Sequence, residues 1–301
     1  MTIKPGIGAT FYGKLPVILN QDVVESCDIV CLHTAADKTD VQTAETVRQM
    51  NPEARIWLGI PANYLSRMDL FQSRKRVLEE CDRVASIALD AGVEVLELNG
   101  EGSSDGKVVG DWIGPMGDAA EAARLEELGR AVTERLKSKL QGKVLLGWTS
   151  HDGTGFRIPR KLLQGVDLHS PQHYPAYENH VVTQRELDRR IQWSKGQWDH
   201  LAARGIVDGS VCPYGSRWSP YLQGWGHSVG ALVWGLCEAP TARLWACPGS
   251  WSPNALPALR AARKIREKYG YGPNAIELFQ KDVRLSADGI VGPMTLAALG
   301  L

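Results

Sequence analysis

The stretch VEVLELNGEG, residues 93–102, alternates polar and apolar side chains and then runs into a glycine-containing loop. Such alternation predicts a β-strand with two different faces, because successive side chains of a strand point in opposite directions. Glu97, Asn99 and Glu101 then share one face, and the leucines between them share the other. The predicted strand therefore presents a row of carboxyl and amide groups on one side and a hydrophobic surface on the other.

Strand-like stretches recur on both sides of this one, separated by helical patterns. The helical patterns cover residues 66–91, 118–140 and 183–204, and a fourth at 228–238 is so apolar that we expect it to be buried. The eight candidate strands are IGATFYG near residue 7, DIVCLHT near 28, RIWLGIP near 55, VEVLELNG near 93, KVLLGWTS near 143, VDLHSPQHY near 166, SVCPYG near 210 and RLWACPG near 243. Eight alternating units predict an α/β chain with a (β/α)8 barrel of the TIM type over residues 1–250.

Active sites of such barrels lie at the carboxyl ends of the strands, and in this sequence those ends are polar and aromatic. Five of the ten tryptophans fall at or just beyond the strand ends: Trp112, Trp148, Trp218, Trp245 and Trp251. Aromatic rings stack on the apolar faces of sugar rings, so this mouth suits a glycan. For any single tryptophan, packing in the core is the alternative.

The carboxyl groups of Glu97 and Glu101 are the candidates for acid–base chemistry, because burial raises the pKa of a carboxyl group and a general acid needs this near neutral pH. We expect Glu101, nearer the mouth, to be the acid and Glu97 to be the nucleophile or an electrostatic support; the reverse assignment stays open. In an extended strand the two would lie about 13 Å apart, too far for a catalytic pair. Either the chain turns at Asn99-Gly100, or a second carboxylate comes from another loop, the candidates being Asp105, Asp111, Asp152 and Glu178. The alternative role for both glutamates is a structural ion-pair network with an arginine.

This strand resembles the Asp-x-Asp-x-Glu strand of chitinase-type barrels, with Glu97, Asn99 and Glu101 in the three places. The pair Gln172-x-Tyr174 in the sixth strand resembles the pair that holds the N-acetyl group of the substrate in those enzymes. The resemblance implies that this acetamide is the nucleophile and that no second protein carboxylate is needed. Because Glu and Asn replace the first two acids, the resemblance is to glycan-cleaving barrels in general. The residues expected to bind the sugar are Asn99, Gln172, Tyr174, Trp112, Trp218 and Trp245.

Histidines provide a competing chemistry. His33, His151, His169 and His173 fall near strand ends and could bind zinc for the hydrolysis of an amide. The His-x-His of many metal-dependent barrels and the His-Glu-x-x-His helix are both absent, as are the nucleophile elbow and the phosphate-binding loop. We therefore expect no metal and no cofactor.

The stretch AIELFQKDVRLSADGIVGPMTLAALGL, residues 275–301, predicts two short helices joined by a turn at Asp288-Gly289. It resembles the second half of the small helical peptidoglycan-binding domain of cell-wall hydrolases, at Phe279, Gln280, Leu285, Asp288, Gly289, Val291, Gly292, Thr295 and Leu299. Only one helix, near residues 257–269, precedes the match, so the module is shorter than in that family. The resemblance implies wall binding through Phe279, Gln280, Asp288 and Thr295; a hairpin that only caps the main domain is the alternative.

The bulk composition excludes several classes of partner. Thirty-four basic and 34 acidic side chains give a formal net charge of zero, so neither a nucleic acid nor an anionic membrane is expected to bind. No apolar run is long enough for a membrane span, and the N-terminus lacks the pattern of a secretory signal, so we expect folding in the cytoplasm. The six cysteines contain no Cys-x-x-Cys pair and are predicted to be buried free thiols.

Together these features resemble a phage endolysin, made in the host cytoplasm and then released to the bacterial cell wall. The predicted domains are a catalytic barrel over residues 1–250 and a helical peptidoglycan-binding module over residues 251–301, with a hinge near 248–257. The expected activity is that of a glycoside hydrolase, a muramidase or N-acetylglucosaminidase acting as a monomer on β-1,4 bonds of peptidoglycan. The alternatives are a metal-dependent N-acetylmuramoyl amidase or peptidase and a non-catalytic wall-binding virion protein.

Overall fold

The computed structural model describes residues 3–12, 19–34, 36–61, 73–99, 119–150, 165–171, 221–222, 228–245, 253–272 and 274–301. Eight parallel strands form one sheet in the order β6-β5-β4-β3-β2-β1-β8-β7. They are β1 (Gly6–Tyr12), β2 (Ile29–His33), β3 (Arg55–Pro61), β4 (Val95–Asn99), β5 (Leu145–Ser150), β6 (Leu168–Pro171), β7 (Tyr221–Leu222) and β8 (Thr241–Trp245). This is the strand order of a (β/α)8 barrel, with β6 and β7 at the two edges of the described sheet.

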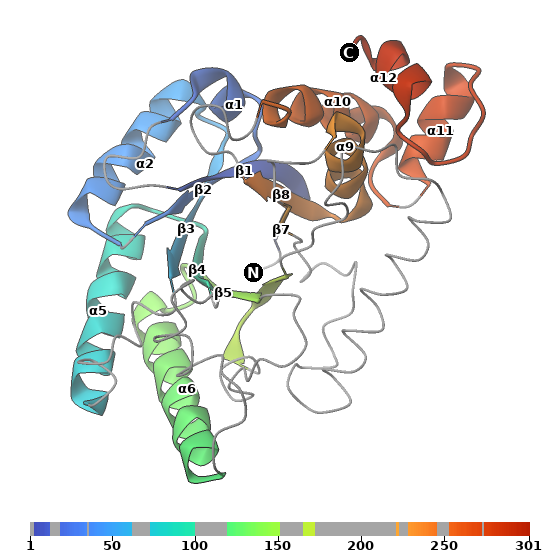
Figure 1. The fold of residues 1–301 in the computed structure, drawn as a ribbon. Helices are drawn as coiled ribbons and strands as arrows, with labels where there is room; N and C mark the ends of the chain where they lie inside the picture. Colours follow the sequence, from blue (N-terminus) through green and yellow to red (C-terminus); the bar gives the residue numbers. More distant parts are fainter. Residues whose placement is uncertain are drawn as a thin grey trace.

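Helices cover the outer face of this sheet (Figure 1). The helices on this face are α1 (Gln21–Glu25), α2 (Lys38–Met50), α5 (Arg74–Asp90), α6 (Ala119–Leu140), α9 (Val229–Glu238) and α10 (Ala255–Tyr269). Two further helices, α11 (Ala275–Asp282) and α12 (Pro293–Leu299), follow at the C-terminus. The predicted α/β class with a parallel sheet is confirmed. The first six predicted strands and the eighth lie where the sequence placed them. The predicted seventh strand near residue 210 and the helix at 183–204 lie outside the described residues. Among the described helices, none is both long and apolar enough to cross a membrane.

Two hydrophobic cores lie on the two faces of the sheet. The larger one fills the space between the strands and the surrounding helices and includes Leu96 and Leu98 of β4, as the alternation predicted. The smaller one lies inside the barrel and consists of Ile3, Ile29, Cys31, Trp57, Val95, Leu145 and Leu168. The strand residues of this inner core lie in the first half of each strand, so the core fills the barrel interior below the level of the carboxyl ends.

Four of the cysteines, Cys27, Cys31, Cys81 and Cys237, are buried free thiols as predicted, and Cys212 and Cys247 lie outside the described residues.

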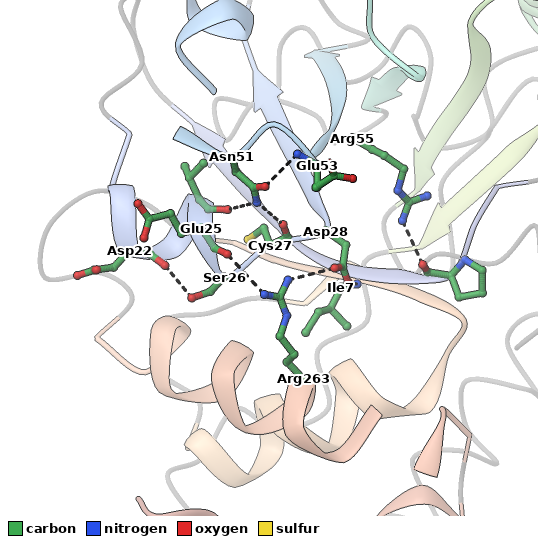
Figure 2. A network of polar contacts seen from close by, with 12 residues as sticks. Ile7, Asp22, Glu25, Ser26, Cys27, Asp28, Asn51, Glu53, Arg55 and Arg263 are labelled. Atoms are coloured by element: carbon green, nitrogen blue, oxygen red, sulfur yellow. Dashed lines mark hydrogen bonds and ion pairs between the residues drawn. The ribbon is translucent and has the colours of Figure 1, made fainter. Parts of the chain in front are cut away.

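The helix α10 is attached to the barrel by charged side chains. Arg263 donates to Asp28 Oδ1 at 3.1 Å and to the Glu25 carbonyl at 3.5 Å, at the base of β2 (Figure 2). Arg266 donates to the carbonyls of Leu236 and Ala239, both at 2.7 Å, and so caps the carboxyl end of α9. Because α10 follows β8 and packs on α9, α1 and β1, it occupies the position of the eighth barrel helix. Our predicted boundary at residues 250 and 251 assigns this helix to the C-terminal module instead.

The last two helices form a hairpin that rests on α9 and α10. The contact with α9 is close, since a Cβ atom at Gly230 would lie 2.1 Å from the carbonyl oxygen of Val291. Pro293 begins α12, and Gly300 ends it with a left-handed backbone (φ 84°), as the sequence predicted.

Candidate active site

A layer of polar side chains crosses the barrel interior above the inner hydrophobic core. Its centre is an ion pair between Glu97 on β4 and Arg243 on β8, with 2.6 Å between Oε2 and Nη2. Both side chains are almost fully buried, with exposed fractions of 4% and 0%. Three strands separate β4 from β8 in the sheet, so the pair spans the interior of the barrel.

Glycines give this pair the space to cross. Gly8 on β1 is in register with Arg243, and a Cβ atom there would lie 2.2 Å from the carbonyl oxygen of Ile29. Gly59 and Gly147 flank Glu97 on the neighbouring strands β3 and β5. A Cβ atom would meet His33 at Gly59 and the side chains of Val95 and Glu97 at Gly147, so the absence of side chains at these positions leaves room for the neighbouring interior side chains.

The Arg243 guanidinium is held from its other side by Trp57, whose ring centroid lies 4.4 Å from Cζ. Trp57 Nε1 in turn donates to Glu94 Oε2 at 2.9 Å. A guanidinium that stacks on an indole ring and pairs with a carboxylate is fixed in both position and orientation. Glu97, Arg243 and Trp57 therefore form a rigid layer in the barrel interior, below the carboxyl ends of the strands.

Next to the ion pair, the imidazole of His33 on β2 meets the carboxamide of Asn99 on β4. Asn99 Nδ2 lies 3.1 Å from His33 Nε2, and both side chains are buried. The pKa of His33 is lowered to about 4, chiefly by burial, while the smaller effects of Glu97 and Arg243 raise and lower it, respectively. His33 is therefore a neutral hydrogen-bonding group near pH 7.

Buried hydroxyl groups continue this polar layer on β5 and β6. Thr149 is in register with Asn99, and Ser170 is in register with Thr149, so the three side chains share the interior face. Thr149 Oγ1 and Ser170 Oγ are fully buried, and within the described part of the chain neither has a hydrogen-bond partner. Unpartnered buried hydroxyls cost free energy, and at the mouth of a barrel they are suited to bind the polar groups of a ligand.

We expect Thr149→Val to raise the free energy of unfolding by about 1 kcal/mol, because an unpartnered buried hydroxyl is replaced by a methyl group. If the hydroxyl binds substrate, the same change lowers kcat/KM by about tenfold. Urea denaturation and steady-state kinetics measure the two effects. Thr43→Val on α2 is the matched control: the Thr43 hydroxyl donates to the Thr39 carbonyl at 2.9 Å, so its loss should lower stability and leave kcat/KM unchanged. A Thr149→Val variant that is less stable than wild type contradicts the prediction.

The predicted shared face of Glu97 and Asn99 is present, and Glu97 pairs with an arginine, which is the alternative that the sequence left open. This pairing favours Glu97 as an electrostatic support, because its carboxyl group is already engaged by the Arg243 guanidinium. Trp245 is the last residue of β8. The predicted residues Glu101, Asp152, Gln172, Tyr174, Trp112 and Trp218 lie outside the described residues, as do the other carboxylates considered, Asp105, Asp111 and Glu178.

Two expectations at the strand ends are corrected. Trp148 is fully buried in the outer core, on the face of β5 opposite to the interior, so it does not line the mouth. His169 is in register with Trp148 and shares that outer face, whereas His33 lies inside the barrel. The two described histidines of the proposed zinc set are therefore not brought together; His151 and His173 lie outside the described residues.

The residues assigned to wall binding form an internal network in the C-terminal hairpin. Gln280 Nε2 donates to Asp288 Oδ1 at 2.8 Å, to the Ile290 carbonyl at 2.9 Å and to Thr295 Oγ1 at 3.1 Å, and Gln280 Oε1 accepts from Gly289 N at 2.9 Å. Gln280, Thr295 and Phe279 are buried. Gln280 and Thr295 thus hold the turn between α11 and α12, and Phe279 packs edge-on against Tyr269, whereas Asp288 is exposed at the turn.

The sequence did not single out Arg243, Gly59, Thr149 or Ser170, and it considered His33 only as a zinc ligand in the alternative metal-dependent interpretation. The signal for Arg243 is its position in RLW, where a lone arginine occurs within an otherwise apolar strand. A charged residue in a buried strand needs a partner, and Glu97 is the acidic residue in the corresponding position of β4.

Solved structures with a similar arrangement of strands and helices include glycoside hydrolases. An endo-β-N-acetylglucosaminidase from Cordyceps militaris superposes with a TM-score of 0.54 at 8% identity, over 86% of this chain and 91% of that one. The chain has the fold of a glycosidase barrel. A mutant of the same enzyme in complex with fucosyl-N-acetylglucosamine-Asn gives 0.51 at 9% identity, over 85% and 89% of the two chains. A glycoside hydrolase family 18 N-acetylglucosaminidase from Paenibacillus barengoltzii gives 0.44 at 11% identity, over 72% and 68%. No family model matches the sequence, and no curated protein matches it.

Proposed function

We propose that the protein is a glycoside hydrolase that cleaves β-1,4 bonds in the glycan strand of peptidoglycan. The observation that carries the proposal is the buried pair of His33 and Asn99 at the carboxyl ends of β2 and β4, with the ion pair of Glu97 and Arg243 directly below it. In a glycosidase barrel this is the place where a sugar binds. The tryptophan-rich sequence of the strand ends adds the apolar surface that sugar rings require.

In this proposal Glu101 protonates the glycosidic oxygen of the leaving sugar, and water completes hydrolysis at the anomeric carbon. Asn99, Gln172 and Tyr174 orient the reacting sugar, and Trp112, Trp218 and Trp245 line the subsites. Glu97, paired with Arg243, supports the site electrostatically from below. The double mutant of the Cordyceps militaris enzyme replaces an aspartate and a glutamate two positions apart, the spacing that Asn99 and Glu101 have in this sequence.

The proposal extends to the C-terminal hairpin as a weak anchor on the cell wall, in the setting of a phage endolysin. A second weak site on a repeating polymer raises the local concentration of the catalytic barrel. Since Phe279, Gln280 and Thr295 are buried, we assign the anchoring surface to exposed residues of the hairpin, and Met294, Ala297 and Ala298 lie together on the exposed side of α12. Met294 has an exposed fraction of 71%.

We expect Met294→Glu to weaken binding to purified sacculi by about tenfold, because burial of a methionine side chain contributes about 1.5–3 kcal/mol. Sedimentation of the full chain with sacculi measures the bound fraction. Gln49→Glu, which adds the same charge to an exposed position of α2, is the control and should bind like wild type. Equal binding of all three proteins would remove the hairpin from the anchoring role.

The test of the proposed activity is mass spectrometry of the soluble products released from purified peptidoglycan, with and without a chelator. New reducing ends on muramic acid or glucosamine, formed with or without the chelator, support the glycosidase and identify the bond. Free stem peptides that disappear on chelation would identify a metal-dependent amidase instead. Absence of products from intact, folded protein would contradict both and favour a wall-binding protein without catalysis.

A further inference from the structure

The contact between His33 and Asn99 depends on a glycine between them. His33 lies on β2 and Asn99 on β4, and Gly59 is the residue of the intervening strand β3 that is in register with His33. A Cβ atom at Gly59 would lie only 2.8 Å from His33 Cδ2. Because Gly59 has no side chain, the imidazole of His33 can lie across β3 and reach Asn99 on β4.

The chemistry of the two contacting atoms defines the protonation of the ring. Asn99 Nδ2 has only hydrogens to offer, so at 3.1 Å His33 Nε2 must accept, and the proton of the neutral ring is on Nδ1. The charged groups facing the ring are Glu97 on β4 and Arg243 on β8, Cys31 precedes it on its own strand, and β3 contributes the uncharged Gly59. Burial lowers the pKa of His33 to about 4, which agrees with a ring that accepts a hydrogen bond at neutral pH.

We propose that His33 is a positioning residue, which fixes the Asn99 carboxamide with its nitrogen toward β2 and so sets the orientation in which this amide meets the bound sugar. The proposal rests on the proposed glycosidase function for its catalytic consequence. The orientation of the Asn99 carboxamide does not depend on that function, because it follows from the contact with His33 and from the absence of a side chain at Gly59. His33 acts only through Asn99 and does not touch the reacting bond.

The orientation is tested first by NMR of the ring nitrogens of His33 in the ¹⁵N-labelled full chain at pH 7. The expected result is a neutral ring with protonated Nδ1 and unprotonated Nε2. Gly59→Ala should perturb these signals, because its Cβ displaces the ring. Gln49→Ala, at an exposed position of α2 on the outside of the barrel, is the control and should leave them unchanged. A ring protonated on Nε2 overturns the proposal whether or not the protein is a glycosidase.

The catalytic consequence is tested by a double-mutant cycle of His33→Phe and Asn99→Ala on soluble peptidoglycan fragments. We expect His33→Phe to lower kcat/KM by about tenfold, the effect of one net hydrogen bond, when Asn99 is present. In the Asn99→Ala background the same change should have less than a twofold effect. Equal losses in both backgrounds would show that His33 acts through general packing and would overturn the positioning role. If the wild-type protein releases no glycan products, the proposed function fails while the NMR result still stands.

Discussion

Arg243→Met is expected to lower the free energy of unfolding by about 3–5 kcal/mol, because it leaves the carboxylate of Glu97 buried without its charged partner. Methionine fills most of the volume of the arginine side chain, so the effect reports the charge more than a cavity. Urea denaturation at pH 7 measures the change, with the slope of the unfolding curve as a check that the transition remains two-state.

The double variant Arg243→Met with Glu97→Met should regain at least half of this loss, since both charges are then absent and the centre of the barrel is apolar. The exposed pair Lys75–Glu79 on α5 is the control, and Lys75→Met should change stability by less than about 0.5 kcal/mol. A single Arg243→Met variant as stable as wild type would mean that the interior does not depend on the ion pair.

Glu101→Gln is expected to lower kcat by at least about a hundredfold, the contribution of a positioned general acid, while wall binding and thermal stability stay nearly unchanged. Glutamine keeps the shape of glutamate and cannot supply the proton. Assays on purified peptidoglycan measure turnover, and Glu53→Gln, an exposed glutamate that precedes β3, provides the same chemical change away from the strand ends. Full activity in a folded Glu101→Gln variant would contradict the assignment of the acid.

The strands were predictable because alternation and apolar runs are local properties of the sequence. The same is true of the face shared by Glu97 and Asn99. The partner of Glu97 was not predictable, because Arg243 is distant in the chain and the contact depends on how far the sheet curves round. The helix α2 was missed because its sequence is rich in threonine, although the capping box of Asp37 and Asp40 marks its start.

The C-terminal part illustrates a different limit. The motif around Gln280 correctly predicted two helices and a turn, since glycine and proline positions determine these locally. The motif could not distinguish residues that hold the turn from residues that contact a ligand, because both uses favour the same polar side chains. The helix α10 was assigned to this module because the preceding loop resembles a hinge in composition, whereas its packing on α9 is a tertiary property.

The ion pair across the barrel also has a consequence for the order of folding. Its two residues are 146 positions apart, and β1 meets β8 only when the first and last strands come together. Contacts of such long sequence separation form late, after the entropy of closing the intervening chain has been lost. Until then Glu97 carries a charge that must stay hydrated, which opposes premature collapse of the first four strands. We infer that closure of the barrel waits for the last strand, which brings the missing guanidinium, so that a fragment ending before β8 should remain expanded.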